Sequence, residues 1–143
     1  MEPYLIGVDI GTGSAKAVAL NYSGEIITSS QRYYKILETQ PGYSEQDPEI
    51  IWDAFMNCMK EVINSVQQVP EAVSFSCANQ SLVVVDKNNR PLTTLSTWAH
   101  ARSEAIAAEI RVSEVAESLY RATGTPIHSM SPLCKIQWLK KND

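Results

Sequence analysis

An acidic residue stands directly before a glycine-containing turn near the start of the chain, in Asp9-Ile-Gly-Thr-Gly-Ser14. Glycines in a tight turn let backbone N–H groups face outward toward an anion, and hydroxyl side chains add further donors. A single carboxylate such as that of Asp9 suits a hydrated magnesium ion, and Lys16 adds positive charge nearby. The expected chemistry is the binding of phosphates and Mg²⁺ by Asp9, Gly11, Thr12, Gly13, Ser14 and Lys16.

Two better-known phosphate-binding motifs do not match this stretch. The dinucleotide fingerprint GxGxxG would need a glycine where Lys16 stands and a helix next, whereas the pattern here indicates a strand. The P-loop needs Gly-Lys-Ser/Thr, which the chain lacks. Because short glycine motifs are weak evidence, an ordinary hairpin turn that begins at a hydrogen-bonded Asp9 remains an equal alternative from spacing alone.

The elements around the turn predict an α/β fold. Apolar runs predict strands over residues 4–9, 16–20 and 25–34, which would form a three-stranded antiparallel meander. Asp47 can then cap a helix with Pro48 in its first position. Apolar residues at a spacing of 3.6 predict about five helical turns. We interpret the whole apolar stripe of this helix as core: Ile51, Trp52, Phe55, Met59, Val62, Ile63 and Val66.

The rest of the chain continues the alternation of strands and helices. A strand over 72–80 ends in polar residues, and a second strand is followed by a turn over 87–91 and an extended piece that reaches Trp98. Helical spacing returns over 101–110 and 114–122. Ser113 is a candidate cap, Gly124 a stop, and a last helix begins near Pro132 behind Ser131, with Ile136 and Leu139 on one side.

Composition narrows the function classes. A length of 143 residues favours one compact unit, and a net charge of −4 disfavours a nucleic-acid partner. Cys58, Cys77 and Cys134 have no disulfide or zinc spacing, so we expect buried, reduced thiols. No apolar run approaches the ~18 residues of a membrane span and no signal segment is present, so we expect a cytoplasmic chain that does not contact a membrane.

Four segments carry a resemblance to a known family. "GVDIGTGSAKAVAL" resembles the first phosphate motif of the actin-like superfamily of sugar kinases, heat-shock ATPases and actins, and is most similar to the FGGY carbohydrate kinases. Further FGGY-like segments follow in family order: "PGYSEQDPEIIWDA", "DKNNRPLTTLSTWAHARS" and "TGTPIHSMSPLCKIQWL". Within the family, the wording around "SMSPLCKIQWL" and "FSCANQSLVVVD" resembles gluconate kinases first and xylulose kinases second.

This resemblance implies a fold and a reaction. The fold would be a ribonuclease H-like, actin-like ATPase domain with a mixed sheet that starts with the antiparallel meander, and residues 1–143 would be the N-terminal part of its first domain. The reaction would transfer the γ-phosphoryl group of ATP, with Mg²⁺, to a hydroxyl of a sugar or sugar acid, gluconate before xylulose. FGGY kinases are roughly three times longer, so the catalytic carboxylate is expected beyond residue 143, none is assigned in this chain, and the isolated chain is expected to be inactive.

The resemblance also assigns the sugar side of the site. Asn79, Gln80 and Ser81 occupy the strand end where the family places sugar contacts, with Trp98, Arg102, His128 and Met130 as second-rank candidates. Many relatives carry Met-His in place of Asn79-Gln80, and often an acid in place of His100. The loss of that acid would suit an anionic sugar.

Each candidate also has an ordinary structural interpretation. Trp98 would be core or pocket wall, and Arg102 would pair on a helix surface with Glu104 or Glu109. The two histidines lack ligand spacing for a metal. For the whole chain, the alternative is a non-catalytic actin-like module that binds a nucleotide or a partner. A truncated half would expose apolar surface, so homodimerisation or aggregation is expected.

Overall fold

The computed structural model describes residues 2–142, which form two compact units and not the one unit that the length favours. The first unit contains the chain through Ile36 together with Asp47–Ala78. The second contains Leu37–Gln46 and the chain from Asn79 onward. The loop before the first helix therefore belongs to the second unit, and the chain crosses between the units three times.

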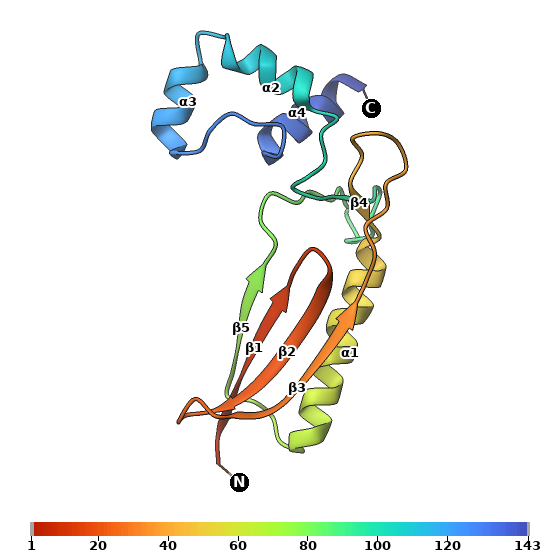
Figure 1. Ribbon diagram of the computed structural model, residues 1–143, viewed down its shortest axis with the longest axis vertical. Coiled ribbons are helices and arrows are strands. Elements are labelled where there is room, and N and C mark those ends of the chain that lie inside the picture. The colour runs from red at the N-terminus through yellow and green to blue at the C-terminus, as the bar shows by residue number, and fades with distance from the viewer. Residues whose placement is uncertain (1, 143) are drawn as a thin grey trace. The chain divides into compact units, whose positions relative to one another are not determined.

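The first unit is built on a four-stranded mixed sheet of order β3-β2-β1-β5 (Figure 1). The predicted antiparallel meander is confirmed as β1 (Tyr4–Ile10), β2 (Ser14–Asn21) and β3 (Ile26–Tyr33). The fourth strand, β5 (Ala72–Cys77), pairs with β1 in parallel and ends before the predicted position at residue 80. The strand ends that follow β1 and β5 therefore lie at the same edge of this sheet.

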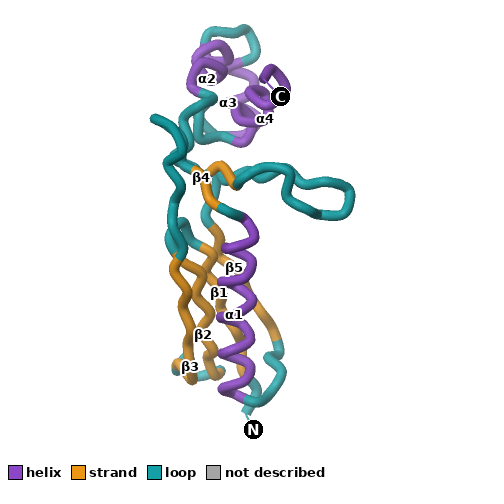
Figure 2. The backbone as a smooth tube through the Cα atoms, turned by 90° about the vertical axis from the view of Figure 1, so that its right-hand side faces the viewer, coloured by secondary structure: helices purple, strands orange, loops and turns teal. Residues whose placement is uncertain are grey.

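Helix α1 (Pro48–Val66) runs along one face of that sheet (Figures 1 and 2). It begins as predicted, since the Oδ1 of Asp47 accepts the N–H of Glu49 at 2.9 Å. The interpretation of its whole stripe as core is wrong at Trp52, which is 58% exposed and packs its ring against Phe55. Because a helix covers a sheet with one face only, adjacent positions at its N-terminus cannot all be buried.

The side chains of β1 point alternately to the two faces of the sheet. Tyr4, Ile6 and Val8 are buried against α1, so Gly7 and Asp9 lie on the opposite face. Small side chains on β2 let the helix approach closely, and those that face it are fully buried: Ala15, Ala17 and Ala19. The core is therefore one-sided, and the acidic residue is carried on the face that α1 does not cover.

The second unit has little regular sheet. Its two strands, β4 (Glu45–Gln46) and β6 (Leu95–Ser96), are two residues long and antiparallel. The strand predicted to follow residue 81 is wrong, since that segment makes isolated bridges, one of them between Leu82 and Ser96. The predicted turn over 87–91 is confirmed, with the side chain of Asp86 accepting two backbone N–H groups within it.

Three helices complete the second unit: α2 (Glu104–Arg111), α3 (Ala116–Thr123) and α4 (Pro132–Asn142). Gly124 ends α3 in a left-handed conformation, with φ of 66°, as predicted. The predicted cap at Ser113 is wrong, because its hydroxyl donates back to an α2 carbonyl and Val115 occupies the N-cap of α3.

The helical core of the second unit differs from the predicted one. Its buried members are Ile106, Ala107 and Cys134, while Ile136 is 45% exposed. The expectation of buried thiols is confirmed for two cysteines and wrong for Cys77, which is exposed on β5. Among residues 2–142, the structure has no helix that is both long enough and apolar enough to cross a bilayer.

Candidate functional site

Asp9 is exposed at the C-terminal end of β1, on the sheet face that α1 leaves open. Its register partners are Lys16 on β2 and Ser76 on β5. A hollow of about 320 Å³ on this face is lined by Gly7, Val8, Asp9, Lys16, Val18, Ser74, Phe75 and Ser76. The carboxylate therefore does not point into the core, which meets the first requirement of the predicted magnesium role.

The turn between β1 and β2 has a tighter internal structure than the sequence suggests. The N–H of Gly11 donates to the carbonyl of Ser14 at 2.9 Å, so this amide does not face outward, and the prediction is wrong for it. Neither Gly11 nor Gly13 has a positive φ. A Cβ at position 11 would lie 3.4 Å from the Oδ2 of Asp9, in ordinary van der Waals contact, and one at position 13 would have no neighbour within 4 Å.

Tyr34, which was not among the predicted site residues, holds this turn through two hydrogen bonds. Its hydroxyl donates to the carbonyl of Gly11 at 2.7 Å, and its backbone N–H donates to the carbonyl of Gly13 at 3.1 Å. Burial, together with the negative charge of Asp9, raises the pKa of the Tyr34 phenol to about 12. The phenol is therefore a neutral donor that fixes the carbonyl of Gly11, while the backbone N–H of the same residue fixes the carbonyl of Gly13. Its only sequence signal is the aromatic pair that ends the third strand.

Two further donors of the predicted phosphate site, Ser14 and Lys16, lie on β2. The hydroxyl of Ser14 accepts a hydrogen bond from the Nε2 of Gln31 at 3.0 Å, which leaves its own proton to donate. Lys16 is exposed, two residues further along the strand. Both side chains are thus available to an anion at the edge where β1 ends.

The residues present fit magnesium better than a softer metal. The described part of the chain contains no group of three His, Cys, Asp or Glu side chains that could hold an ion. A tetrahedral zinc site needs such a set, whereas Mg²⁺ keeps most of its waters and uses one or two carboxylates plus phosphate oxygens. Asp9 beside an open glycine turn matches the second pattern.

In the second unit, the segment Asn79–Ser81 is held by a buried lysine that the sequence did not suggest. Gln80 has a left-handed backbone, with φ of 64°, and its carbonyl accepts a hydrogen bond from the Nζ of Lys135 at 2.6 Å. The same Nζ donates to the carbonyl of Thr97 at 2.7 Å. Lys135 is only 4% exposed. The structure thus joins two of the predicted sugar-side segments, 79–81 and the one that contains Trp98, through one ammonium group.

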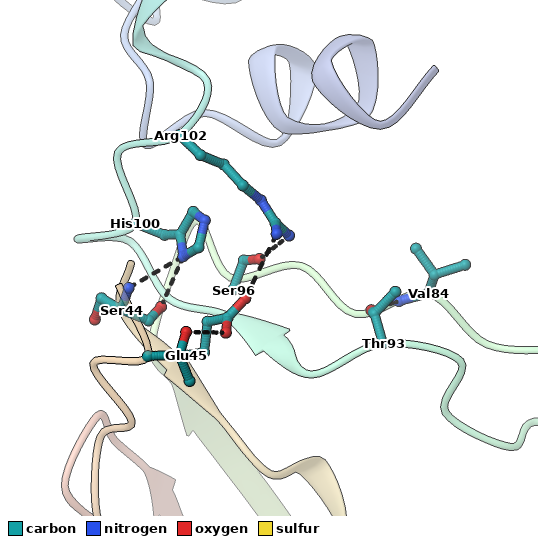
Figure 3. A network of polar contacts seen from close by, with 8 residues as sticks. Ser44, Glu45, Val84, Thr93, Ser96, His100 and Arg102 are labelled. Carbon is teal, nitrogen blue, oxygen red and sulfur yellow. Dashed lines mark hydrogen bonds and ion pairs between the residues drawn. The ribbon is translucent and has the colours of Figure 1, made fainter. Parts of the chain in front are cut away.

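A network of polar side chains surrounds the start of β4 (Figure 3). The guanidinium of Arg102 donates to the hydroxyl of Ser96 at 3.2 Å and lies 3.6 Å from the carboxylate of Glu45. The hydroxyls of Ser44 and Thr97 lie 2.7 Å apart. Segments separated by more than 50 residues in the sequence are therefore joined by side-chain bonds in place of a regular sheet.

Arg102 is partly buried in this network and does not form the surface ion pair considered above. Its partner is Glu45, whereas Glu104 pairs with Arg111 and Glu109 with Lys141. The guanidinium also lies 4.5 Å from the centre of the Trp138 ring and 5.3 Å from that of Tyr43. The alternative pairing with Glu104 or Glu109 is wrong, because each of these carboxylates pairs with another cation and Arg102 precedes the first residue of α2.

His100 is a buried member of this polar network. Its Nδ1 accepts the backbone N–H of Ser44 at 3.1 Å (Figure 3), and the side chain is 1% exposed. Burial, and then the charge of Arg102, lowers the pKa of His100. Its Nε2 is buried and has no hydrogen-bond partner among residues 2–142. The Nδ1 also lies 3.2 Å from the carbonyl oxygen of Ser44, so the tautomer decides which of the two contacts to Ser44 is the hydrogen bond. The lowered pKa favours the neutral ring.

The other second-rank candidates occupy more open positions. Trp98 is 51% exposed, so the interpretation of this side chain as core is wrong. His128 is exposed, and its Nδ1 accepts the backbone N–H of Met130 at 3.1 Å. That bond is local to the turn before α4. The structure thus bonds Arg102 to Ser96 and holds Gln80 and Thr97 through Lys135, while His128 and Met130 bond to each other.

Comparison with known proteins gives consistent matches over nearly the whole chain. Residues 4–143 match the sequence model of the "FGGY family of carbohydrate kinases, N-terminal domain". The chain is 36% identical to a gluconokinase of Bacillus licheniformis over 140 residues, and 30% identical to a xylulose kinase of Staphylococcus xylosus over 141 residues. The crystal structure of gluconate kinase from Lactobacillus acidophilus superposes with a TM-score of 0.92 at 30% identity.

These relatives are much longer than the chain. The alignments cover 97% of the chain but 27% of the B. licheniformis protein, and 98% but 29% of the S. xylosus protein. The superposition covers 99% of the chain and 29% of the gluconate kinase. The match therefore covers nearly the whole of this chain and less than a third of each relative.

Proposed function

The chain belongs to the FGGY family of carbohydrate kinases, and from that membership we propose that it is the N-terminal part of an enzyme that phosphorylates gluconate with ATP. Residues 1–143 would form the beginning of its first actin-like domain. Transfer of the γ-phosphoryl group to a terminal hydroxyl would give 6-phosphogluconate. Xylulose or another pentulose is the second candidate, because the xylulose kinase is also a close relative.

The observation that carries the proposal is the exposed carboxylate of Asp9 beside a turn that lacks side chains at two positions. Phosphoryl transfer needs positioned phosphates and neutralised charge more than it needs covalent chemistry by the protein. Asp9 at an exposed strand end, next to the glycine turn and the exposed Lys16, supplies such an arrangement. Tyr34 keeps that turn in one conformation before any ligand binds.

In the proposed site, the first unit binds the phosphates of ATP. Asp9 would hold Mg²⁺ through its water shell, and the ion when bound would neutralise phosphate charge. The outward-facing parts of residues 12–14, with the hydroxyls of Thr12 and Ser14, would donate to phosphate oxygens. Gly11 leaves room for that approach, and Lys16 would add a positive charge.

The second unit would supply the sugar side. Asn79, Gln80 and Ser81 would hydrogen-bond to sugar hydroxyls, since amide side chains can both donate and accept. Trp98 would offer an exposed ring face to the carbon skeleton. Arg102, His128 and Met130 remain secondary candidates. The general base that accepts the proton of the sugar hydroxyl is expected from a later part of the full-length protein.

The charge of the second unit favours gluconate over a neutral ketose. Arg102 and Lys135 are two cations in the region behind the predicted sugar contacts, and Glu45 is the carboxylate that faces Arg102. The resemblance to FGGY kinases implies an acid in many relatives at the position of His100, whose lowered pKa favours a neutral ring. An additional carboxylate at that position would repel a carboxylate on the substrate, so its replacement supports a sugar acid.

The test is a substrate screen on the full-length protein with ATP and Mg²⁺, measuring ADP release with gluconate, xylulose and glycerol. We expect gluconate to give the largest kcat/KM. Release of ADP with xylulose and not with gluconate would overturn the substrate assignment. Nucleotide binding without ADP release for any of the three would favour the non-catalytic module.

A second measurement addresses the metal role directly. Asp9→Asn is expected to lower kcat by about 100- to 1,000-fold, because an amide keeps the shape but lacks the charge that attracts a cation. Asp53→Asn, on the exposed surface of α1, is the matched control and should leave kcat within about 2-fold. An Asp9→Asn enzyme with unchanged kcat at limiting Mg²⁺ would remove Asp9 from the site.

A further inference from the structure

We infer that Lys135 is a positioning residue, whose ammonium group holds the main chain at Gln80 and Thr97 in the conformation that presents Asn79–Ser81 and Trp98 to the sugar. The inference rests on the proposed function, which places these residues at the sugar. Nothing in the sequence marks Lys135 beyond its position between apolar neighbours in "PLCKIQWL".

The geometry is that of one donor group with two acceptors from distant segments. The Nζ of Lys135 donates to the carbonyl of Gln80 at 2.6 Å and to that of Thr97 at 2.7 Å. The residues lie 55 and 38 positions away along the chain. Hydrogen bonds from an ionised donor are shorter and about twice as strong as neutral ones, and these distances fall in that class. Helix α4 thus fixes both segments through a single side chain.

Lys135 is an unusual choice if stability alone is considered. The side chain is 4% exposed, and no carboxylate forms an ion pair with it among the described residues. Its charged neighbour Arg102 has the same sign, and burial together with that charge lowers the pKa of Lys135 to about 8. A buried, unpaired ammonium is costly, and an apolar side chain of similar volume is often better for stability. Its carbonyl contacts therefore point to a role in fixing a conformation.

The conformation it fixes is one that the backbone would not adopt freely. Gln80 has a φ of 64°, in the left-handed region that residues with a Cβ rarely occupy. Such positions persist only where the surroundings hold them, and they concentrate at binding sites. The bond from Lys135 to the carbonyl of Gln80 is the restraint seen here, and without it the peptide could rotate to an extended or right-handed conformation.

The two held segments also bond to each other, which makes the arrangement cooperative. Leu82 and Ser96 exchange backbone hydrogen bonds at 2.9 and 2.8 Å. The carbonyl of Thr97 also accepts the N–H of His100 at 3.1 Å. Removal of the ammonium should therefore loosen residues 80–82 and 96–98 together, and leave the sheet of the first unit unchanged.

The experiment compares Lys135→Met with the wild type in the full-length protein, since methionine keeps the volume and removes the donors. We expect the KM for the sugar to rise about 10- to 100-fold, with the KM for ATP within about 2-fold. Lys135→Arg keeps the charge and should recover part of the sugar KM. Lys140→Met, on the exposed surface of the same helix, is the control and should change neither constant.

Hydrogen–deuterium exchange provides a readout that does not need activity. In Lys135→Met we expect faster exchange at the amides of Leu82 and Ser96, and unchanged exchange in β1 and β2. If the wild type phosphorylates none of the three sugars, the proposed function fails, and exchange still decides whether Lys135 holds these segments. Unchanged exchange in the variant, or equal rises in the KM for sugar and for ATP, would overturn the inference.

If Lys135→Met does not fold, the inference is tested with the conservative Lys135→Arg variant and with the wild type. In the wild type, we expect the protection of the Leu82 amide against hydrogen exchange, corrected for intrinsic exchange, to fall as the pH rises through about 8. Such a fall would support the role of the ammonium. The charged or titratable neighbours that act on Lys135 and its surroundings are Arg102, His100 and Glu45. Constant protection from pH 7 to 9 would overturn the inference.

Discussion

The two units of this chain hold their shapes by different means. In the first unit, a stripe of apolar residues on α1 packs against alternate residues of a regular sheet, and the core contains Tyr4, Ile6, Val8 and Val62. In the second unit, the buried set is mostly polar: Ser44, Glu45, Gln46, Ser96, Thr97, His100, Ser103, Ser129 and Lys135. Burial of apolar area stabilises without direction, whereas buried polar groups require specific partners.

This difference agrees with the roles proposed for the two units, phosphate binding for the first and sugar binding for the second. A phosphate-binding turn needs a rigid base, and a sheet with a helix on one face supplies it through packing alone. A sugar site needs several polar groups at fixed positions, and an irregular unit joined by side-chain hydrogen bonds can place them without long strands. The comparison predicts that the first unit is sensitive to lost volume and the second to lost hydrogen-bond partners.

The largest expected effect is the loss of volume in the first unit. Ile6→Ala, at a side chain that is 1% exposed, should lower the free energy of unfolding by about 2 to 5 kcal/mol. Exchange at the β1 and β2 amides in the full-length protein measures it. Val69→Ala in the same unit, at 80% exposure, is the control and should change stability by less than about 0.5 kcal/mol. Similar values for both variants would contradict a core packed at Ile6.

The same difference explains what the sequence could predict. Periodicity of apolar residues predicted the meander and α1, and Asp47-Pro48 located the start of the helix, because these signals are local. Trp52 was assigned to the core and is exposed, since the helical period does not say how wide the covered stripe is. In the first unit the elements are therefore predicted correctly except for the end of β5, and the other errors concern single residues: Trp52, Cys77 and the amide of Gly11.

The second unit was predicted less well for a physical reason. The two acceptors of Lys135 lie 38 and 55 residues away along the chain, and Glu45 lies 57 residues from Arg102. No local sequence pattern encodes such pairings. The strand predicted after residue 81 had suitable composition, but its backbone partner was a two-residue strand. Asp9 and the glycine turn could be proposed from the sequence because their residues are contiguous, whereas Tyr34 and Lys135 contact these segments from 23 or more residues away along the chain.

An intermediate effect is expected from a buried hydrogen bond in the second unit. Ser103 is fully buried, and its hydroxyl donates to the carbonyl of Ser129 at 2.8 Å. Ser103→Ala should lower the free energy of unfolding by about 1 to 3 kcal/mol, because a buried carbonyl loses its donor. Ser113→Ala removes a similar bond at an exposed position and should change it by less than about 0.5 kcal/mol. Equal values in urea denaturation would refute the polar basis of the second unit.

The smallest expected effect is a pH dependence that Lys135 gives to the second unit. The pKa of Lys135 is lowered to about 8 in the folded protein, below its ordinary value of 10.5. Below pH 8 the side chain is charged in both states, and its burial destabilises the fold by a constant amount. Between pH 8 and 10.5 the unfolded chain binds more protons, so the contribution of Lys135 to stability rises with pH.

Comparison with Lys135→Met isolates this contribution. The free energy of unfolding of Lys135→Met should exceed that of the wild type by the largest amount near pH 7. Urea denaturation should show this difference to be smaller by about 1 to 2 kcal/mol at pH 10. Groups such as Cys134, whose pKa is raised, titrate equally in both proteins and cancel. A difference that stays constant from pH 7 to 10 would contradict a buried ammonium. Since the sugar KM should worsen over the same range in which Lys135 becomes less destabilising, the opposite signs separate its positioning role from any role in stability.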